Sequence, residues 1–224
     1  DSDEYLTKGE SIHDCYKHNP LINTAFAPHA PYTVSDDVLK RIAVLAEELD
    51  IPIHMHIHET SDEIKQSINQ YGIRPFERLS ELGLLSSRLI AVHMTQLEQN
   101  EINELKRTRV NVVHCPESNL KLASGFCPVG KLQNSDINVC IGTDGAASNN
   151  DLDMLGEMRT SALLAKGVAN DSTCSDAYTT LKMATLNGAK ALGLSESIGS
   201  LKKGKQADIV AIDLNRIETT PLYE

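Results

Sequence analysis

Histidine and acidic side chains recur along this sequence at the points where short apolar runs end. One segment closes with three of them, His56, His58 and Glu59. The others each follow a run of their own: His29, His93, His114 and Asp144. Imidazole nitrogens and carboxylate oxygens are the ligands that Zn²⁺ and similar divalent ions take from proteins. If the fold brings these groups together, the sequence predicts a divalent metal centre.

The elements that would position these residues follow a repeated strand–helix pattern, which is typical of a parallel sheet built from βα units. The clearest predicted helix begins after Ser35, a good N-cap, and carries Val38, Ile42 and Leu45 on one face. Further helices are expected over residues 97–106, 129–133, 151–166 and, as one or two helices, 175–192. The predicted strands are Leu21–Ala27, Ile51–His58, Leu89–His93, Val110–His114, Ile137–Gly142 and, after the alternation stops, Asp208–Leu214.

Five successive βα units indicate either a doubly wound sheet or a (β/α)₈ barrel. In a barrel the C-terminal ends of all strands meet at one mouth, where the active site is built. A doubly wound sheet spreads the same ends along an edge. An imidazole or carboxylate at the end of every strand therefore favours the barrel, and five strands in place of eight make it an incomplete one.

No single residue among these is persuasive alone. His114 by itself is more simply a hydrogen-bonded structural histidine, and Asp144 in a Gly-Thr-Asp-Gly sequence could be a turn residue. Strand periodicity places His54, His56 and His58 on one face at different depths, so one of them is expected to reach a shared metal. His13 and His18 are expected to be solvated, in a polar N-terminal helix.

Composition narrows the class of protein. The 224 residues carry a formal net charge of −10, which argues against nucleic acid or an anionic membrane as the main partner. No apolar run approaches the roughly 18 residues of a membrane span. The five cysteines are scattered and never form a C-x-x-C pair, so a reducing cytoplasm is the expected compartment. There is no G-x-S-x-G, no P-loop, and no match to the H-x-E and P-C-x-x-C zinc deaminases.

Taken in order, five motifs resemble the amidohydrolase superfamily, in the branch of 5-methylthioadenosine/S-adenosylhomocysteine deaminases and triazine chlorohydrolases. The segment Gly199–Asp213 resembles the return of that superfamily into its small β-sandwich, and the resemblance covers nearly the whole chain. The motifs are Ala27-Pro-His-Ala-Pro-Tyr32, His56-Ile-His-Glu-Thr60, Ala91-Val-His93, His114-Cys-Pro-Glu-Ser-Asn-Leu-Lys-Leu122 and Ile141-Gly-Thr-Asp-Gly-Ala-Ala-Ser-Asn-Asn150.

The resemblance implies a role for each motif residue. His56 would be the metal ligand from the fifth barrel strand and Asp144 the ligand from the eighth. Glu59 would pass a proton to the substrate ring, and His93 would hydrogen-bond the metal-bound hydroxide. His29 would contact the substrate. The expected cofactor is one divalent ion, zinc first and iron second, and the expected substrate is a small purine-type nucleoside.

The same resemblance places two further ligands, an H-x-H pair, on a first strand upstream of this sequence. We therefore expect barrel strands of about 4–8 over residues 1–193 and part of the small β-sandwich over 194–224. An open half-barrel exposes strand edges and apolar faces, so a homo-oligomer is expected.

Other functions are also compatible with the sequence: some use the same site for a different reaction, and one involves no catalysis. The leaving group could be chloride from a triazine, or ammonia from guanine or cytosine, although Glu59 as an acid favours a deaminase. A binuclear hydantoinase type would want a bridging lysine in Leu21–Ala27, which has none. From another class, the chain could be a catalytically incomplete module that only binds or assembles.

Overall fold

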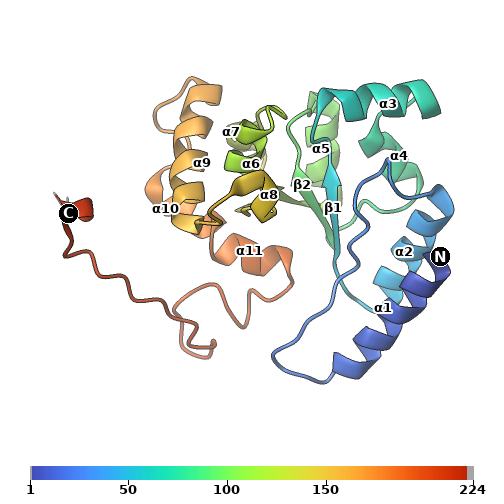
Figure 1. Cartoon of the computed structure of the whole chain (residues 1–224), viewed down its shortest axis with the longest axis horizontal. Helices are drawn as coiled ribbons and strands as arrows, with labels where there is room; N and C mark the ends of the chain where they lie inside the picture. Colours follow the sequence, from blue (N-terminus) through green and yellow to red (C-terminus); the bar gives the residue numbers. More distant parts are fainter. Residues whose placement is uncertain (1, 221–224) are drawn as a thin grey trace.

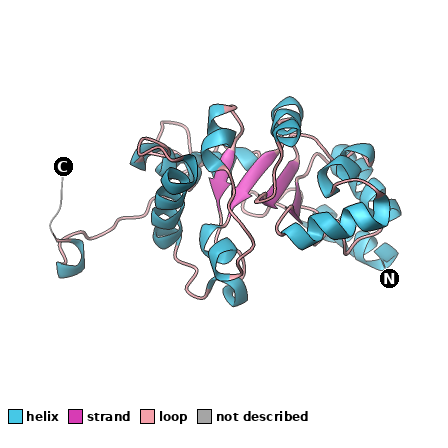
Figure 2. Cartoon of the chain, turned by 90° about the horizontal axis from the view of Figure 1, so that it is seen from above, coloured by secondary structure: helices cyan, strands magenta, loops and turns pink. Residues whose placement is uncertain are grey.

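A four-stranded parallel sheet forms the centre of the molecule, and helices flank it (Figures 1 and 2). The computed structural model describes residues 2–220. The strands lie side by side in chain order, β1-β2-β3-β4, and every pair is parallel. Their bounds are Ile53–Ile57 for β1, Leu89–His93 for β2, Asn111–His114 for β3 and Val139–Ile141 for β4.

The register of the sheet brings the strand ends level with one another. Ile57 pairs with His93, and His114 pairs with Ile141. The polar residues that close these strands therefore meet along one edge, as the sequence predicts.

The prediction of a strand over Leu21–Ala27 is wrong except at one residue. Phe26 makes an isolated parallel bridge to Ile53; its N–H donates to the Pro52 carbonyl (2.9 Å) and its carbonyl accepts from His54 N–H (2.8 Å). Pro28 has no N–H to continue the ladder. At the other end Leu21 is 83% exposed, so no buried face holds that part as a strand.

The helices begin and end close to where the sequence places them. Helix α9 is displaced by three residues from the predicted 151–166, because the Asp153 carboxylate accepts a hydrogen bond from Leu155 N–H (2.9 Å) and caps it. The predicted stretch 175–192 forms two helices. The bounds are Ser2–Tyr16 (α1), Asp36–Glu48 (α2), Ser61–Tyr71 (α3), Pro75–Glu81 (α4), Gln99–Thr108 (α5), Pro116–Lys121 (α6), Val129–Asn134 (α7), Ala146–Asn149 (α8), Met154–Ala169 (α9), Ala177–Met183 (α10), Leu186–Ala191 (α11) and the 3₁₀ turn Ile217–Thr219 (η1).

The two faces of β1 differ in chemistry. Ile53, Met55 and Ile57 are buried in the main apolar core, while His54 and His56 lie on the opposite face. This period-2 pattern leaves the helix-covered side apolar and the other side polar.

After α11 the chain first turns back on itself, with Gln206 N–H donating to the Ser197 carbonyl (2.8 Å) and Gly199 close to Ala189 of α11, and then extends away from the sheet and helices to η1 (Figure 1). The predicted strand Asp208–Leu214 is wrong: these residues are not in a strand, and Val210 is 85% exposed. The physical reason is that no described strand lies beside this segment to pair with it. The domain division at 193/194 stays a prediction. No helix within residues 2–220 is long and apolar enough to cross a membrane.

Candidate metal centre and active site

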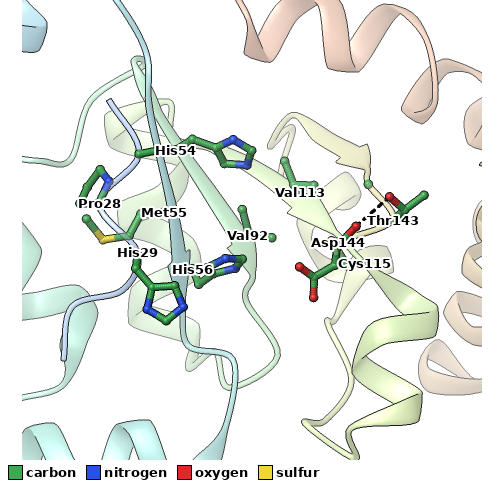
Figure 3. Close-up of a pocket in the computed structure, with 12 residues that line it drawn as sticks. Pro28, His29, His54, Met55, His56, Val92, Val113, Cys115, Thr143 and Asp144 are labelled. Carbon is green, nitrogen blue, oxygen red and sulfur yellow. Dashed lines mark hydrogen bonds between the residues drawn. The ribbon is translucent and has the colours of Figure 1, made fainter. Parts of the chain in front are cut away.

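His56, His93 and Asp144 come together at the carboxyl ends of three elements. One ligand-type atom from each lies within 4.8 Å of the others. His56 Nδ1 is 2.9 Å from His93 Nε2, and the two rings stack with centroids 5.0 Å apart. Figure 3 shows His29 and His56 on one side of the pocket, with Asp144 on the facing side. Two imidazoles and a carboxylate form a donor set that suits zinc.

The two imidazoles at this point differ in their partners. Burial, and next the charge of His93, lowers the pKa of His56, so its ring is neutral at pH 7 and able to ligate a metal. His93 is 1% exposed, and its Nδ1 lies 2.8 Å from Asn119 Oδ1. Its other nitrogen, Nε2, is 3.8 Å from Glu59 Oε2.

Asp144 is held in an uncommon backbone conformation and by two hydroxyl groups. Its φ of +64° is the left-handed region, which a short polar residue tolerates. Its Oδ2 accepts hydrogen bonds from Ser118 Oγ (2.6 Å) and Ser148 Oγ (2.7 Å). Burial alone would raise the pKa of Asp144, but these hydrogen bonds outweigh it and hold the pKa below its ordinary value. Asp144 is therefore an ionised carboxylate at neutral pH.

Glu59 follows β1 on a turn that its neighbours fix. Both carboxylate oxygens of Glu63 accept backbone N–H groups, from His58 (3.0 Å) and from Glu59 (2.8 Å). Thr95 Oγ donates to the Glu59 carbonyl (2.6 Å), and Ser124 Oγ donates to the Glu59 side chain (3.3 Å). The backbone of Glu59 is therefore anchored while its carboxylate faces His93.

A cavity of about 510 Å³ opens beside these groups, a size within the range of small-molecule sites. His29 is exposed at its edge, with its ring 5.3 Å from that of His56 and its Nδ1 3.3 Å from Thr33 Oγ. The cavity is lined by Ala27, Pro28, His29, His54, Met55, His56, Val92, Val113, Cys115, Gly142, Thr143 and Asp144 (Figure 3).

Two buried histidines, His58 and His114, do not join the metal group. The prediction that His58 shares a face with His54 and His56 is wrong, because its φ of +54° turns it off the strand. Its buried Nε2 accepts a hydrogen bond from Phe76 N–H (3.1 Å). His114 is fully buried, and neither ring nitrogen has a hydrogen-bond partner among the described residues, contrary to the hydrogen-bonded role expected of it. Burial lowers the pKa of His114 to about 3, which keeps it neutral.

The N-terminal histidines differ from each other. His13 in α1 is half-buried and its Nδ1 lies 2.8 Å from Thr24 Oγ, so the expectation of a solvated side chain is wrong for it. His18 lies beyond the end of α1 and is exposed.

Sequence reasoning missed the residues that hold the site together: Ser118, Asn119, Ser148, Glu63 and Thr95. Ser118 and Asn119 stand inside the quoted motif that begins at His114, and Ser148 stands inside the one that begins at Ile141, so the motifs were the available signal for these three. The partners of Ser118 and Asn119 lie on other strands, so sequence spacing alone could not supply the pairing.

Comparison with known proteins agrees with the motifs. The amidohydrolase family pattern matches residues 2–223. A 5-methylthioadenosine/S-adenosylhomocysteine deaminase of Saccharophagus degradans is 54% identical over 99% of this chain and 50% of its own length. A 5'-deoxyadenosine deaminase of Methanothermobacter thermautotrophicus is 46% identical over 89% of this chain and 46% of its own. The chain spans about half the length of the curated relatives it matches.

Solved structures show the same fold. An adenosine deaminase from Xanthomonas campestris with bound zinc superposes with a TM-score of 0.97 at 58% identity, over 99% of this chain and 51% of that one. Atrazine chlorohydrolase from Arthrobacter aurescens, complexed with zinc, gives a TM-score of 0.92 at 25% identity, over 100% and 50%. The predicted incomplete (β/α)₈ barrel is thereby confirmed. With its motifs, strand order and family match in agreement, this chain belongs to the amidohydrolase family.

Proposed function

We propose that the protein carrying this chain is a metal-dependent hydrolytic deaminase of adenosine-type nucleosides that bear a 5'-thioether, such as 5-methylthioadenosine or S-adenosylhomocysteine. The observation that carries the proposal is the grouping of His56, His93 and Asp144 within 4.8 Å, with Glu59 3.8 Å from His93. The names of the relatives, which are deaminases of adenosine-type compounds, support this class of substrate.

The donor set fits a zinc ion, with His56 and Asp144 as the ligands from this chain. His56 is neutral and Asp144 is ionised, and these are the states in which each side chain ligates a metal. When bound, such an ion would lower the pKa of water toward about 7 and so supply hydroxide at neutral pH. The zinc in the two similar structures supports the choice of metal, with iron as the second candidate.

The chain's own residues would then move the protons. The ionised Asp144 carboxylate, held at Oδ2 by two serine hydroxyl groups, would accept a proton from the attacking water and pass it to the amino group that leaves as ammonia. Glu59 would deliver a proton to the ring nitrogen as negative charge builds there. His93 Nε2 would hydrogen-bond the tetrahedral carbon's new oxygen, and His29 at the cavity edge would contact the substrate.

Dehalogenation is the second candidate, because atrazine chlorohydrolase shares the fold. Its identity of 25%, against 54% for a deaminase, places it second. A guanine deaminase from E. coli also superposes, at 26% identity with a TM-score of 0.84. The third reading, a module that binds without catalysis, is disfavoured because the described residues retain every predicted catalytic group.

The test is an assay of the complete protein loaded with zinc, which measures ammonia release from 5-methylthioadenosine and chloride release from atrazine. We expect ammonia only. Glu59→Gln should lower kcat about 10²- to 10⁴-fold while zinc content is kept, whereas His56→Ala should lose zinc and activity together. His13→Ala, a half-buried histidine outside the site, is the matched control. Full activity in the Glu59 variant would contradict the proposal.

A reducing compartment such as the cytoplasm is proposed with the enzyme. The five cysteines are all free thiols, and three of them are buried.

A further inference from the structure

Two adjacent residues of α6 each reach a different member of the candidate centre. Ser118 is 0% exposed and donates to Asp144 Oδ2, at 2.6 Å. Asn119 is 1% exposed and places its Oδ1 2.8 Å from His93 Nδ1. Asp144 and His93 belong to the ends of β4 and β2, which are not neighbours in the sheet.

The strand order explains how one short helix can reach both. Strand β3 lies between β2 and β4, and α6 begins two residues after β3 ends. The helix therefore sits over the middle of the three strand ends. Consecutive helical residues point about 100° apart, so Ser118 and Asn119 diverge toward the two flanking strands. Contacts with α8 and α9 hold α6 in this position.

The Asn119 contact determines which nitrogen of His93 carries the proton, and the Ser118 contact orients the carboxylate of Asp144. The Asn119 carboxamide oxygen can only accept, so His93 Nδ1 must carry the hydrogen. In the neutral ring Nε2 is then the lone-pair nitrogen, and it is the one that faces His56 and Glu59. The Ser118 hydroxyl donates to Asp144 Oδ2, as does the Ser148 hydroxyl of α8, and together they favour Oδ1 as the oxygen that ligates the metal.

The cost of keeping Asn119 in place supports a functional reason for it. Its Nδ2 is buried and has no hydrogen-bond partner among residues 2–220. An unsatisfied buried donor of this kind destabilises the folded state, because its hydrogen bond to water is lost without replacement. Fold stability alone would favour an apolar side chain at this position.

We propose that α6 is a positioning clamp for the reaction, in which Asn119 sets the tautomer of His93 and Ser118, together with Ser148 of α8, orients the carboxylate of Asp144 for ligation. The proposal rests on the proposed deaminase function for its kinetic consequences. Its structural part stands apart, since tautomer and metal affinity are measurable without turnover.

The test uses the complete protein and five variants, two of which are controls. Asn119→Leu removes the acceptor, and Asn119→Asp retains one. Ser118→Ala removes the donor to Asp144. Asn111→Leu is the matched control, since Asn111 is a buried asparagine with two side-chain hydrogen bonds at the opposite end of β3.

The first readout is the ¹⁵N NMR spectrum of the histidine rings in metal-free protein. We expect His93 to carry its proton on Nδ1 in the wild type, in Asn119→Asp and in Asn111→Leu, and to become a tautomer mixture in Asn119→Leu. Zinc affinity is the second readout, and Ser118→Ala should weaken it about 10- to 100-fold. Ser67→Ala, which also removes one buried serine hydrogen bond, should leave zinc affinity unchanged.

Kinetics supply the third readout. Asn119→Leu should lower kcat about 10- to 100-fold with KM changed by less than about 3-fold, and Asn119→Asp should restore most of kcat. A His93 spectrum in Asn119→Leu identical to the wild type, or an unchanged zinc affinity in Ser118→Ala, would overturn the clamp. A wild-type protein without deaminase activity would refute the proposed function while the NMR and zinc readouts still decide the clamp.

Discussion

Two carboxyl groups near the centre show how neighbouring donors decide the charge of a residue. Asp144 accepts from two serine hydroxyl groups, and its pKa lies below the ordinary value although burial opposes this. Glu63 accepts two backbone N–H groups, yet its burial outweighs them and raises its pKa to about 7. At neutral pH Asp144 is therefore fully ionised, whereas Glu63 is present in both its charged and its neutral form.

The raised pKa of Glu63 predicts a specific pH dependence of stability. The folded state binds a proton at Glu63 that the unfolded state has released between about pH 4.5 and 7, so this group's contribution to the unfolding free energy falls as pH rises through that window. The full difference is about 3 kcal/mol. His58 and His114, whose pKa values burial lowers to about 3, act in the opposite sense below pH 6.5.

Because these histidines also titrate, the contribution of Glu63 has to be measured as the difference in unfolding free energy between the Glu63→Gln variant and the wild type. We expect the stability of Glu63→Gln relative to the wild type to improve steadily between pH 4.5 and 7, as measured by urea unfolding at each pH. Glu157→Gln is an independent second test and should show the same trend, because burial raises the pKa of Glu157 to about 7 as well, at α9 and away from the Glu59 turn. A constant difference between Glu63→Gln and wild type across this range would refute the assignment.

At the scale of elements, the turn after β2 is tied to the turn after β1 through Thr95, and Gly125 makes room for this contact. A Cβ at position 125 would lie 2.5 Å from Gln96 Nε2 and 3.0 Å from Thr95 Oγ. The φ of Gly125 is +131°, which strains any other residue. The Thr95 hydroxyl is the group that holds the Glu59 carbonyl.

Gly125→Ala should therefore destabilise the protein by about 1–3 kcal/mol and lower kcat as well. The control is Gly188→Ala in α11, where a Cβ meets nothing within 4 Å and where alanine should stabilise by up to about 1 kcal/mol. Thermal unfolding and kcat measured on both variants check this. Unchanged stability and turnover in Gly125→Ala would show that the loop adapts and that Thr95 is not essential to Glu59.

What the sequence could predict at this scale depends on how local each signal is. The run Leu89–His93 is apolar and β-branched, and its predicted bounds are those of β2. The run Leu21–Ala27 carries the same local signal, but Pro28 and the lack of a covering face reduce it to one bridge. The contacts of Ser118 and Asn119 span 26 residues each and depend on where α6 lies over the sheet. No pattern of spacing encodes that placement.

At the scale of the whole molecule, the sheet is open. No described strand pairs with the outer edge of β4, where the Asn187 carboxamide donates to the Val139 carbonyl (2.8 Å). On the other side of the sheet β1 has only the Phe26 bridge. The extended segment after α11 adds exposed apolar side chains, among them Leu201, Ile209, Val210, Ile212 and Ile217. Unpaired edges and exposed apolar patches both promote association.

We therefore predict that the 224-residue chain, produced alone, self-associates at micromolar concentration, with a sedimentation coefficient that rises with concentration. The variant Val210→Lys/Ile212→Lys separates the two causes, because these side chains are 85% and 57% exposed and lie far from the sheet edges. A monomeric variant would assign the association to the apolar tail segment; an unchanged one would assign it to the sheet. Lys202→Glu/Lys203→Glu, in the same exposed segment, controls for a change of charge alone. A wild-type chain that sediments as a monomer at every concentration would refute the prediction, because neither the open sheet edges nor the apolar tail segment would then drive self-association.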